Sequence, residues 1–236
     1  MLQTRKVITI DGLAATGKSS IAQSLAKKIQ YTHFSSGLLY RLLGYAVLSG
    51  YADTEKEAEV LKYLNKHRLE IALDASGGNV ALLDGKDITA SLFATKVSEA
   101  SSKVSVHPTV RQYLLEKQRS IFEGQNIIAE GRDMGTIVFP NADLKFFIEV
   151  DPKVRIERRI AQQGKPKDLS GEELKLLKHK MEIEVVERDR RDRDRPVSPT
   201  VPAPGAIIIN NSVESLTEVV ERMYIFVSKT GLSQGL

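Results

Sequence analysis

The chain contains no cysteine and no tryptophan. Without cysteine there is no disulfide, no thiolate nucleophile and no cysteine-ligated zinc or iron–sulfur centre. The four histidines show no metal-ligand spacing, so a histidine-rich metal site is not expected either. These absences exclude thiol chemistry and the common cysteine and histidine metal sites.

Long apolar runs are also scarce. The most apolar of the longer stretches, residues 38–48, is interrupted by Arg41 and is too short to span a bilayer. The first ten residues carry no apolar segment of signal-peptide length, so we expect them to be mature sequence. The expectation is a soluble, cytoplasmic protein without membrane contacts.

An excess of charge of one sign is nearly absent as well. The 236 residues include 34 Lys+Arg and 30 Asp+Glu, a net charge of +4, and 42% are hydrophobic. This composition can fill one large or two small cores. The small positive excess suits a protein that handles anions and does not by itself indicate nucleic-acid binding.

Short apolar runs alternate with longer helical patterns, which favours an α/β fold with a doubly wound, five-stranded parallel sheet. The predicted strands are Val7–Ile10, Tyr31–Phe34, Ile127–Ala129, Lys145–Val150 and Ala206–Ile209. The predicted helices are Lys18–Ile29, Leu38–Ser49, Glu55–Lys66, Thr109–Glu123, Pro152–Gln163, Gly171–Arg190 and Val213–Ser228.

One segment departs from this alternation. Residues 69–74 and 79–83 flank Ser76-Gly77-Gly78 in the manner of a β-hairpin. An antiparallel hairpin within a parallel α/β series indicates a small inserted α+β domain. We therefore predict an insert at 53–105 and a core formed by 1–52 and 106–236.

A phosphate-binding motif follows the first predicted strand. Residues 12–19 read Gly-Leu-Ala-Ala-Thr-Gly-Lys-Ser and match the pattern G-x-x-x-x-G-K-[ST] at the start of a helix. Glycines let the backbone N–H groups turn inward, and the helix N-terminus adds a positive dipole end. Lys18 can reach the β- and γ-phosphates and Ser19 can ligate Mg²⁺. The sequence therefore predicts binding of a nucleoside triphosphate.

Among proteins with such a loop, a small kinase fits best. The guanine-reading Asn-Lys-x-Asp of a GTPase is missing, since Asn65-Lys66-His67-Arg68 fails at its last position. Asp74-Ala-Ser-Gly77 resembles a switch motif but falls in the predicted hairpin turn. A mechanical ATPase is usually longer. A kinase further needs an acceptor site, cations to cover the phosphates, and groups that hold the acceptor anion.

Three segments can supply these parts. Ser36 and Arg41 follow the second predicted strand, and Glu130–Thr136 follows the third, at the sheet edge where such folds bind ligands. A cationic helix carries three arginines ahead of Gly164-Lys165-Pro166 and can close over a phosphoryl group: Arg155, Arg158 and Arg159.

The arginine-rich segment 187–195 has five Arg and four acidic residues, a net charge of +1 with the signs interleaved. Such a segment is normally a salt-bridged helix face rather than a nucleic-acid site. Steps of three and four residues along this segment join Arg188, Arg191 or Asp192, and Arg195. One face of a helix can therefore present guanidinium and carboxylate groups to a phosphate or a sugar.

Together these strings resemble those of bacterial cytidylate kinases, which are nucleoside monophosphate kinases. The matching strings occur in the family order over nearly the whole chain: Ile8–Gly12 with the phosphate loop, Ser36-Gly37-x-x-Tyr40-Arg41, Gly131–Thr136 and Arg188-Asp-x-x-Asp192-x-x-Arg195. The string Gly-Arg-Asp-Met-Gly-Thr is the most specific of them. Adenylate kinases are less similar, because their Asp-Gly-Phe-Pro-Arg string is missing.

The resemblance implies ATP as donor, CMP and dCMP as acceptors, a lid at about 153–170, and a monomer. It implies catalytic roles for Lys18, Arg132, Asp133, Arg158 and Arg188. It implies ATP binding by Gly12, Leu13, Ala14, Ala15, Thr16, Gly17, Lys18, Ser19, Ser20, Arg155, Arg158 and Arg159, with Mg²⁺ on Ser19. It implies acceptor binding by Ser36, Arg41, Ser102, Arg111, Arg132, Asp133, Arg188, Asp192 and Arg195.

The chain departs from the family pattern at two positions. Ser35 replaces the usual Asp, so Glu130 or Asp133 would have to help place Mg²⁺, and Leu13 replaces the usual Pro. Two alternatives stay open: a kinase of another small acceptor such as UMP or AMP, and an RNA-binding regulatory ATPase that uses the segment 187–195.

Overall fold

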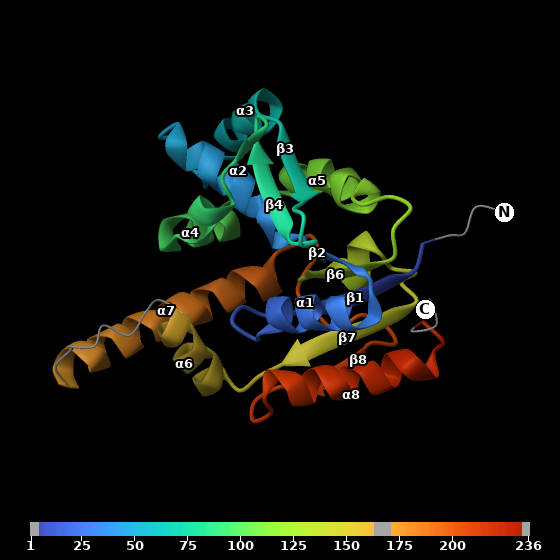
Figure 1. Ribbon diagram of the computed structural model, residues 1–236. Coiled ribbons are helices and arrows are strands. Elements are labelled where there is room, and N and C mark those ends of the chain that lie inside the picture. Colours follow the sequence, from blue (N-terminus) through green and yellow to red (C-terminus); the bar gives the residue numbers. More distant parts are fainter. Residues whose placement is uncertain (1–4, 163–170, 233–236) are drawn as a thin grey trace.

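The computed structural model describes residues 5–162 and 171–232. Its centre is a five-stranded sheet with the order β2-β6-β1-β7-β8, in which every neighbouring pair is parallel (Figure 1). The strands are β1 (Val7–Gly12), β2 (Thr32–Ser35), β6 (Ile127–Gly131), β7 (Leu144–Glu149) and β8 (Ile207–Asn210). All five predicted strands are therefore confirmed.

Helices cover both faces of this sheet. Alternate residues of β1 point to opposite faces, and Val7 joins one hydrophobic cluster while Ile8 and Ile10 join the other. The second cluster packs α1 (Lys18–Ile29) and α8 (Leu216–Lys229) on one face, and the first packs α2 (Gly37–Ser49) and α5 (Pro108–Ser120) on the other. The predicted doubly wound α/β architecture is confirmed.

The segment between α2 and α5 packs on α2 rather than around a core of its own. Val60, Leu92 and Val104 belong to the same hydrophobic cluster as Phe34 and Leu43 of the core. This segment contains α3 (Glu57–Lys66), β3 (Leu69–Leu73), β4 (Asn79–Leu83), β5 (Lys86–Asp87), the 3₁₀ helix η1 (Thr89–Phe93) and α4 (Thr95–Val104). The boundaries of the insert at 53–105 stay a prediction.

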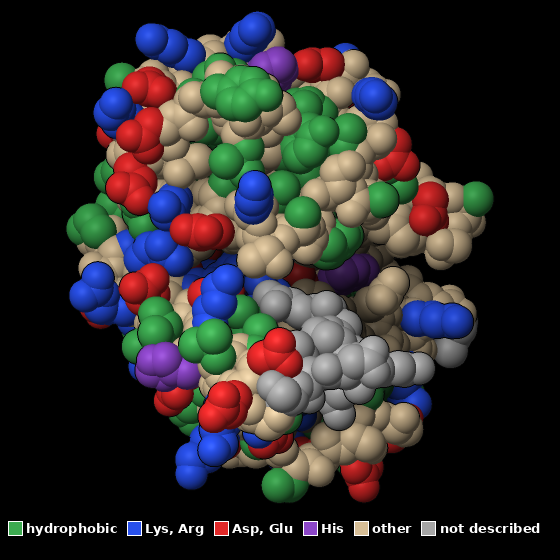
Figure 2. All heavy atoms as spheres, turned by 90° about the vertical axis from the view of Figure 1, so that its left-hand side faces the viewer, with side chains coloured by type: hydrophobic (Ala, Val, Ile, Leu, Met, Phe, Trp, Pro, Cys, Tyr) green, Lys and Arg blue, Asp and Glu red, His purple; other side chains and the backbone are tan. Residues whose placement is uncertain are grey.

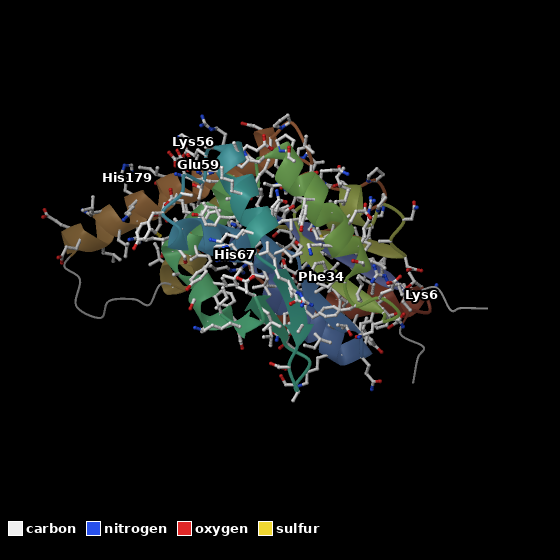
Figure 3. The ribbon with its side chains drawn as sticks, turned by 90° about the horizontal axis from the view of Figure 1, so that it is seen from above. Lys6, Phe34, Lys56, Glu59, His67 and His179 are labelled. Atoms are coloured by element: carbon white, nitrogen blue, oxygen red, sulfur yellow. The ribbon has the colours of Figure 1, made fainter. Side chains whose placement is uncertain are left out.

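The outer end of the insert carries charged side chains. Seen from above in Figure 3, Lys56 and Glu59 lie together at the start of α3, where their charged groups are 3.4 Å apart. Phe34, by contrast, is fully buried on β2 and meets the ring of Phe122 edge to face, with 6.3 Å between the centroids. The start of α3 thus carries exposed charge, whereas Phe34 of β2 is buried in the core.

The C-terminal half adds a π-helical turn, η2 (Met134–Val138), and two helices, α6 (Pro152–Gln162) and α7 (Gly171–Asp194), which lie against each other at one end of the sheet (Figure 1). The helix predicted to end at residue 190 continues to Asp194. The second half of the predicted lid, residues 163–170, lies outside the described residues. No helix of the described ranges combines the length and apolarity needed to cross a membrane.

Candidate active site

The phosphate loop forms a tight curl between β1 and α1. A Cβ atom on Gly12 would lie 2.6 Å from the carbonyl oxygen of Ile148, so only glycine fits there. Ala15 and Gly17 have φ angles of 58° and 83°, in the left-handed region, and Gly17 is the N-cap of α1. The loop therefore ends on the free N–H groups of a helix start, which favour an anion. We call residues 12–20 the donor loop.

Lys18 is buried at the floor of this loop. Its Nζ donates to the carbonyl oxygen of Leu13 at 3.4 Å and lies 3.9 Å from Oε2 of Glu130. Burial, followed by the charge of Arg132, lowers the pKa of Lys18 to about 7. A bound polyphosphate would favour the protonated form, so this lysine is suited to an anionic ligand.

Glu130 links the donor loop to the end of β2. Its carboxylate accepts hydrogen bonds from Oγ of Ser19, at 2.9 Å, and from Oγ of Ser35. Burial raises the pKa of Glu130, but the charges of Lys18 and His33 and the two hydroxyl donors outweigh it and leave the pKa below its usual value. The three oxygen-bearing side chains of Ser19, Ser35 and Glu130 are of the kind that Mg²⁺ prefers.

A network of buried ion pairs lies beside Glu130. Arg111, on α5, pairs with Asp133, which follows β6. Arg195, just after α7, lies 3.8 Å from Asp133 and 3.9 Å from Asp192. Nε of Arg132 donates to Asp192 at 2.8 Å. We call these five residues the acceptor network.

The arginines decide the charge of Asp192. Burial raises its pKa, but Arg132, Arg188 and Arg195 outweigh that effect and lower the pKa to about 2. Asp192 is therefore ionised, and the ion pairs of the network join three separate segments of the chain. This explains how α7, which has few buried apolar residues, is fixed against the sheet.

Other polar groups near the acceptor network are left for a ligand. Burial and the charge of Arg132 lower the pKa of Arg188 to about 9, and its Nε has no partner within the described part of the chain. The buried hydroxyl of Ser102 is likewise unpaired there. Arg41, by contrast, donates to the carbonyl oxygen of Leu92 and to Oγ of Ser98, both at 2.7 Å. Burial, then the charge of Arg159, lowers its pKa to about 10. Buried cations that repel one another favour binding of an anion.

Two adjoining cavities meet at these residues. The smaller, of about 350 Å³, is lined by the acceptor network and by Ser36, and the larger, of about 910 Å³, is lined by part of the donor loop and by Arg159. Lys18, Arg132 and Arg188 line both. Figure 2 shows the hollow across this face, with cationic and acidic side chains gathered along it. Arg41 lines both as well, so two ligands can approach one another over four cations.

The family model described as "Cytidylate kinase" matches residues 8–229. The chain belongs to the cytidylate kinase family. A cytidylate kinase of Pectobacterium carotovorum subsp. carotovorum (strain PC1) is 37% identical over 218 residues, covering 92% of this chain and 93% of the relative. Those of Vibrio vulnificus (strain YJ016) and Marinomonas sp. (strain MWYL1) are 38% and 36% identical, over 92% and 98% of this chain and 92% and 100% of theirs.

In this cytidylate kinase family member, two of the three arginines of α6 contact the donor loop. Arg155 donates to the carbonyl oxygen of Ala14 at 3.3 Å, and Arg158 donates to that of Thr16 at 3.4 Å. Arg159 makes no such bond among the described residues and lines the larger cavity instead. The other predicted site residues line one of the two cavities or belong to the donor loop, whereas Arg155 and Arg158 lie on α6 and line neither cavity.

Sequence reasoning gave no role to two residues that support α6 and the donor loop. Asp189 pairs with Arg155 at 2.7 Å. Nδ2 of Asn211, just after β8, donates to the carbonyl oxygen of Thr16 at 3.0 Å. Asp189 lies within the interleaved segment 187–195, whose helical spacing could have indicated it. Asn211 has no such signal.

Asp11 belongs to the matching string Ile8–Gly12 but received no role from the sequence. Its carboxylate accepts hydrogen bonds from the N–H groups of Met134, at 2.9 Å, and Gly135, at 2.8 Å. Burial raises the pKa of Asp11 to about 7. The side chain ties the end of β1 to η2, and so the donor loop to the segment that carries Arg132 and Asp133.

Proposed function

We propose that the chain transfers the γ-phosphoryl group of ATP to CMP and dCMP, giving CDP and dCDP for pyrimidine nucleotide metabolism. Membership of the cytidylate kinase family supports this reaction. The observation that carries it at the level of residues is the junction of two cavities over Lys18, Arg132 and Arg188. A donor in one cavity and an acceptor in the other would meet there.

The reaction needs no general base, because the acceptor phosphate oxygen is already anionic. Catalysis then consists of alignment and of neutralising the charge that develops on the transferring group. Lys18, Arg132 and Arg188 supply that neutralisation where the two cavities meet. Arg158 is a further catalytic cation, and with Arg155 it would turn from the loop carbonyls to the donor phosphates.

Acceptor recognition would use both the network and the unpaired groups beside it. Ser36, Ser102, Arg111 and Asp133 offer donors and acceptors of the kind a cytosine ring can pair with. Arg41 and Arg132 would hold the monophosphate, and the sugar or phosphate would contact residues of the segment at the end of α7: Arg188, Asp192 and Arg195. Because side chains of the network are held by one another, the site is preorganised.

Mg²⁺ would be held by Ser19 with help from Glu130, since the hydroxyl and carboxylate already lie 2.9 Å apart. When bound, the ion neutralises charge on the phosphates. Asp133 is the weaker candidate for this role, because Arg111 and Arg195 already engage it. The proposal further includes a cytoplasmic monomer that does not bind nucleic acid.

The test is an acceptor panel. Purified protein is given ATP, Mg²⁺ and either CMP, dCMP, UMP, AMP or GMP, and ADP formation is followed by a coupled assay. We expect CMP and dCMP to be turned over with kcat/KM at least tenfold above the others. A preference for UMP or AMP would reassign the acceptor, and ATP hydrolysis without any acceptor dependence would contradict a kinase.

A further inference from the structure

The free edge of β2 is closed by a side chain of the insert. β2 is the outermost strand of the parallel sheet. The N–H groups of Thr32 and Ser36 point toward β6, where they donate to Asn126 and Glu130. The backbone groups of the intervening residues His33 and Ser35 therefore turn to the open edge, where a further strand would normally pair with them.

Asn79, the first residue of β4, takes the place of that strand. Its Oδ1 accepts a hydrogen bond from the N–H of Ser35 at 2.8 Å, and its Nδ2 donates to the carbonyl oxygen of His33 at 2.6 Å. One carboxamide thus makes both bonds that a neighbouring strand would make. All three residues are partly buried, so these bonds are partly shielded from water.

The hairpin that carries Asn79 is itself well held. Asn79 pairs with Leu73 on β3, and the turn between them is closed by Asp74, which accepts from the N–H groups of Ser76 and Gly78. The carboxamide is therefore presented from a strand that pairs with β3 along its whole length, and this pairing does not depend on the turn bonds of Asp74. It is a direct polar link between the insert and the sheet, one residue before Ser36.

We propose that Asn79 is a positioning residue for the acceptor nucleotide. It fixes the end of β2, and through Ser35 it sets where Ser36 lies in the smaller cavity, which Asn79 also lines. Residues 18–20 of the donor loop line the same cavity, but both hydrogen bonds of the Asn79 carboxamide go to β2 and none to that loop. Taking CMP as the acceptor rests on the function proposed above; the contact between Asn79 and β2 does not.

The experiment compares Asn79→Ala with a control in the same hairpin, Asp74→Ala, which loosens the turn but keeps the carboxamide. Asn79→Ala should raise KM for CMP about 3- to 10-fold, the change expected for loss of a hydrogen bond. KM for ATP should stay within about twofold, and kcat should change less than KM for CMP. Asp74→Ala should leave both KM values within about twofold.

Amide hydrogen exchange gives a second readout that needs no turnover. The N–H of Ser35 should exchange about tenfold faster in Asn79→Ala and at the wild-type rate in Asp74→Ala. An unchanged KM for CMP in Asn79→Ala overturns the proposal, as does an equal rise in Asp74→Ala. If the wild-type protein does not use CMP, the proposed function fails instead. The same variants then test Asn79 with the best acceptor of the panel.

Discussion

The donor loop and the acceptor network adjoin the same pair of cavities and differ in what they offer a ligand. The donor loop presents mainly backbone N–H groups and one buried lysine, Lys18. Its curl depends on Gly12, on the left-handed residues Ala15 and Gly17, and on the start of α1. The acceptor network presents side chains, with five residues from three separate segments joined by ion pairs.

The contrast between backbone groups and side chains follows from the chemical groups that the donor and the acceptor present to the protein. A polyphosphate presents only oxygens and charge, which backbone N–H groups and a lysine can hold without reading a base. A cytosine must be told from other bases, and that needs donors and acceptors at fixed positions. We therefore expect changes on the donor side to affect catalysis, and changes on the acceptor side to affect stability and selectivity.

The largest expected effect is on the donor side. Lys18→Ala removes one of the cations that line both cavities, the one on the donor loop, and kcat should fall about 10³- to 10⁵-fold, the range for a cation acting on a transferring phosphoryl group. The free energy of unfolding should not fall, because an unliganded buried lysine with a lowered pKa does not stabilise the fold. Turnover assays and urea unfolding measure the two.

Lys18→Arg is the matched control, since it keeps the charge but changes the shape of the donor group. It should recover only part of the lost kcat. Unfolding of Lys18→Ala at markedly lower urea than wild type would contradict the idea that this side chain serves catalysis alone.

The next effect is on the acceptor side and concerns stability. Asp133→Ala leaves Arg111 buried without its partner, since both side chains are only 5% exposed. Removing one member of a buried pair costs about 3–5 kcal/mol of unfolding free energy. Urea unfolding measures this. Glu221→Ala, which breaks the exposed pair with Lys28, is the control and should cost less than about 1 kcal/mol. Equal losses in the two variants would show that the network does not hold the segments together.

The sequence predicts the donor side more completely than the acceptor side, for a physical reason. The donor loop is local: one string of eight residues determines the turn, the helix start and the lysine, and α1 runs from Lys18 to Ile29 as predicted. The acceptor network joins residues up to 84 positions apart, such as Arg111 and Arg195 on either side of Asp133. The family resemblance pointed to the residues of the network, but neither it nor the sequence predicted which of them form ion pairs with one another.

The elements that the sequence did not predict have weak local signals. The helix α4 begins Thr-Lys-Val-Ser, without a strong apolar period, and is held by packing on α2. The turn η2 depends on Asp11, which lies more than 120 residues away. Helix α7 runs four residues past its predicted end because Asp192 and Arg132 pair there.

A smaller effect should appear at acidic pH. The pKa of Asp192 is lowered to about 2 from an ordinary value of 3.8, so the native state binds the proton more weakly than the unfolded state. This carboxylate therefore adds about 2 kcal/mol of stability above pH 4, of which about half is lost by pH 3 as the pH falls toward 2.

The check is urea unfolding of wild type and Asp192→Asn at pH 6 and pH 3. Between these pH values, wild type should lose about 1 kcal/mol more than the variant. Parallel losses in the two proteins would mean that the arginines around Asp192 do not hold its charge.

The smallest effects compare one side chain from each side directly. Ala15→Gly changes the donor loop at a left-handed residue where glycine fits at least as well, so kcat and both KM values should stay within about twofold.

Ser102→Ala removes a buried hydroxyl that has no partner among the described residues, so stability should hold while KM for CMP rises about 3- to 10-fold. Steady-state kinetics with both substrates measure this. The donor loop, which binds through its backbone, should tolerate Ala15→Gly, whereas the acceptor site, which reads a base, should not tolerate Ser102→Ala. Equal effects of the two substitutions on KM for CMP would remove the distinction between the two sides.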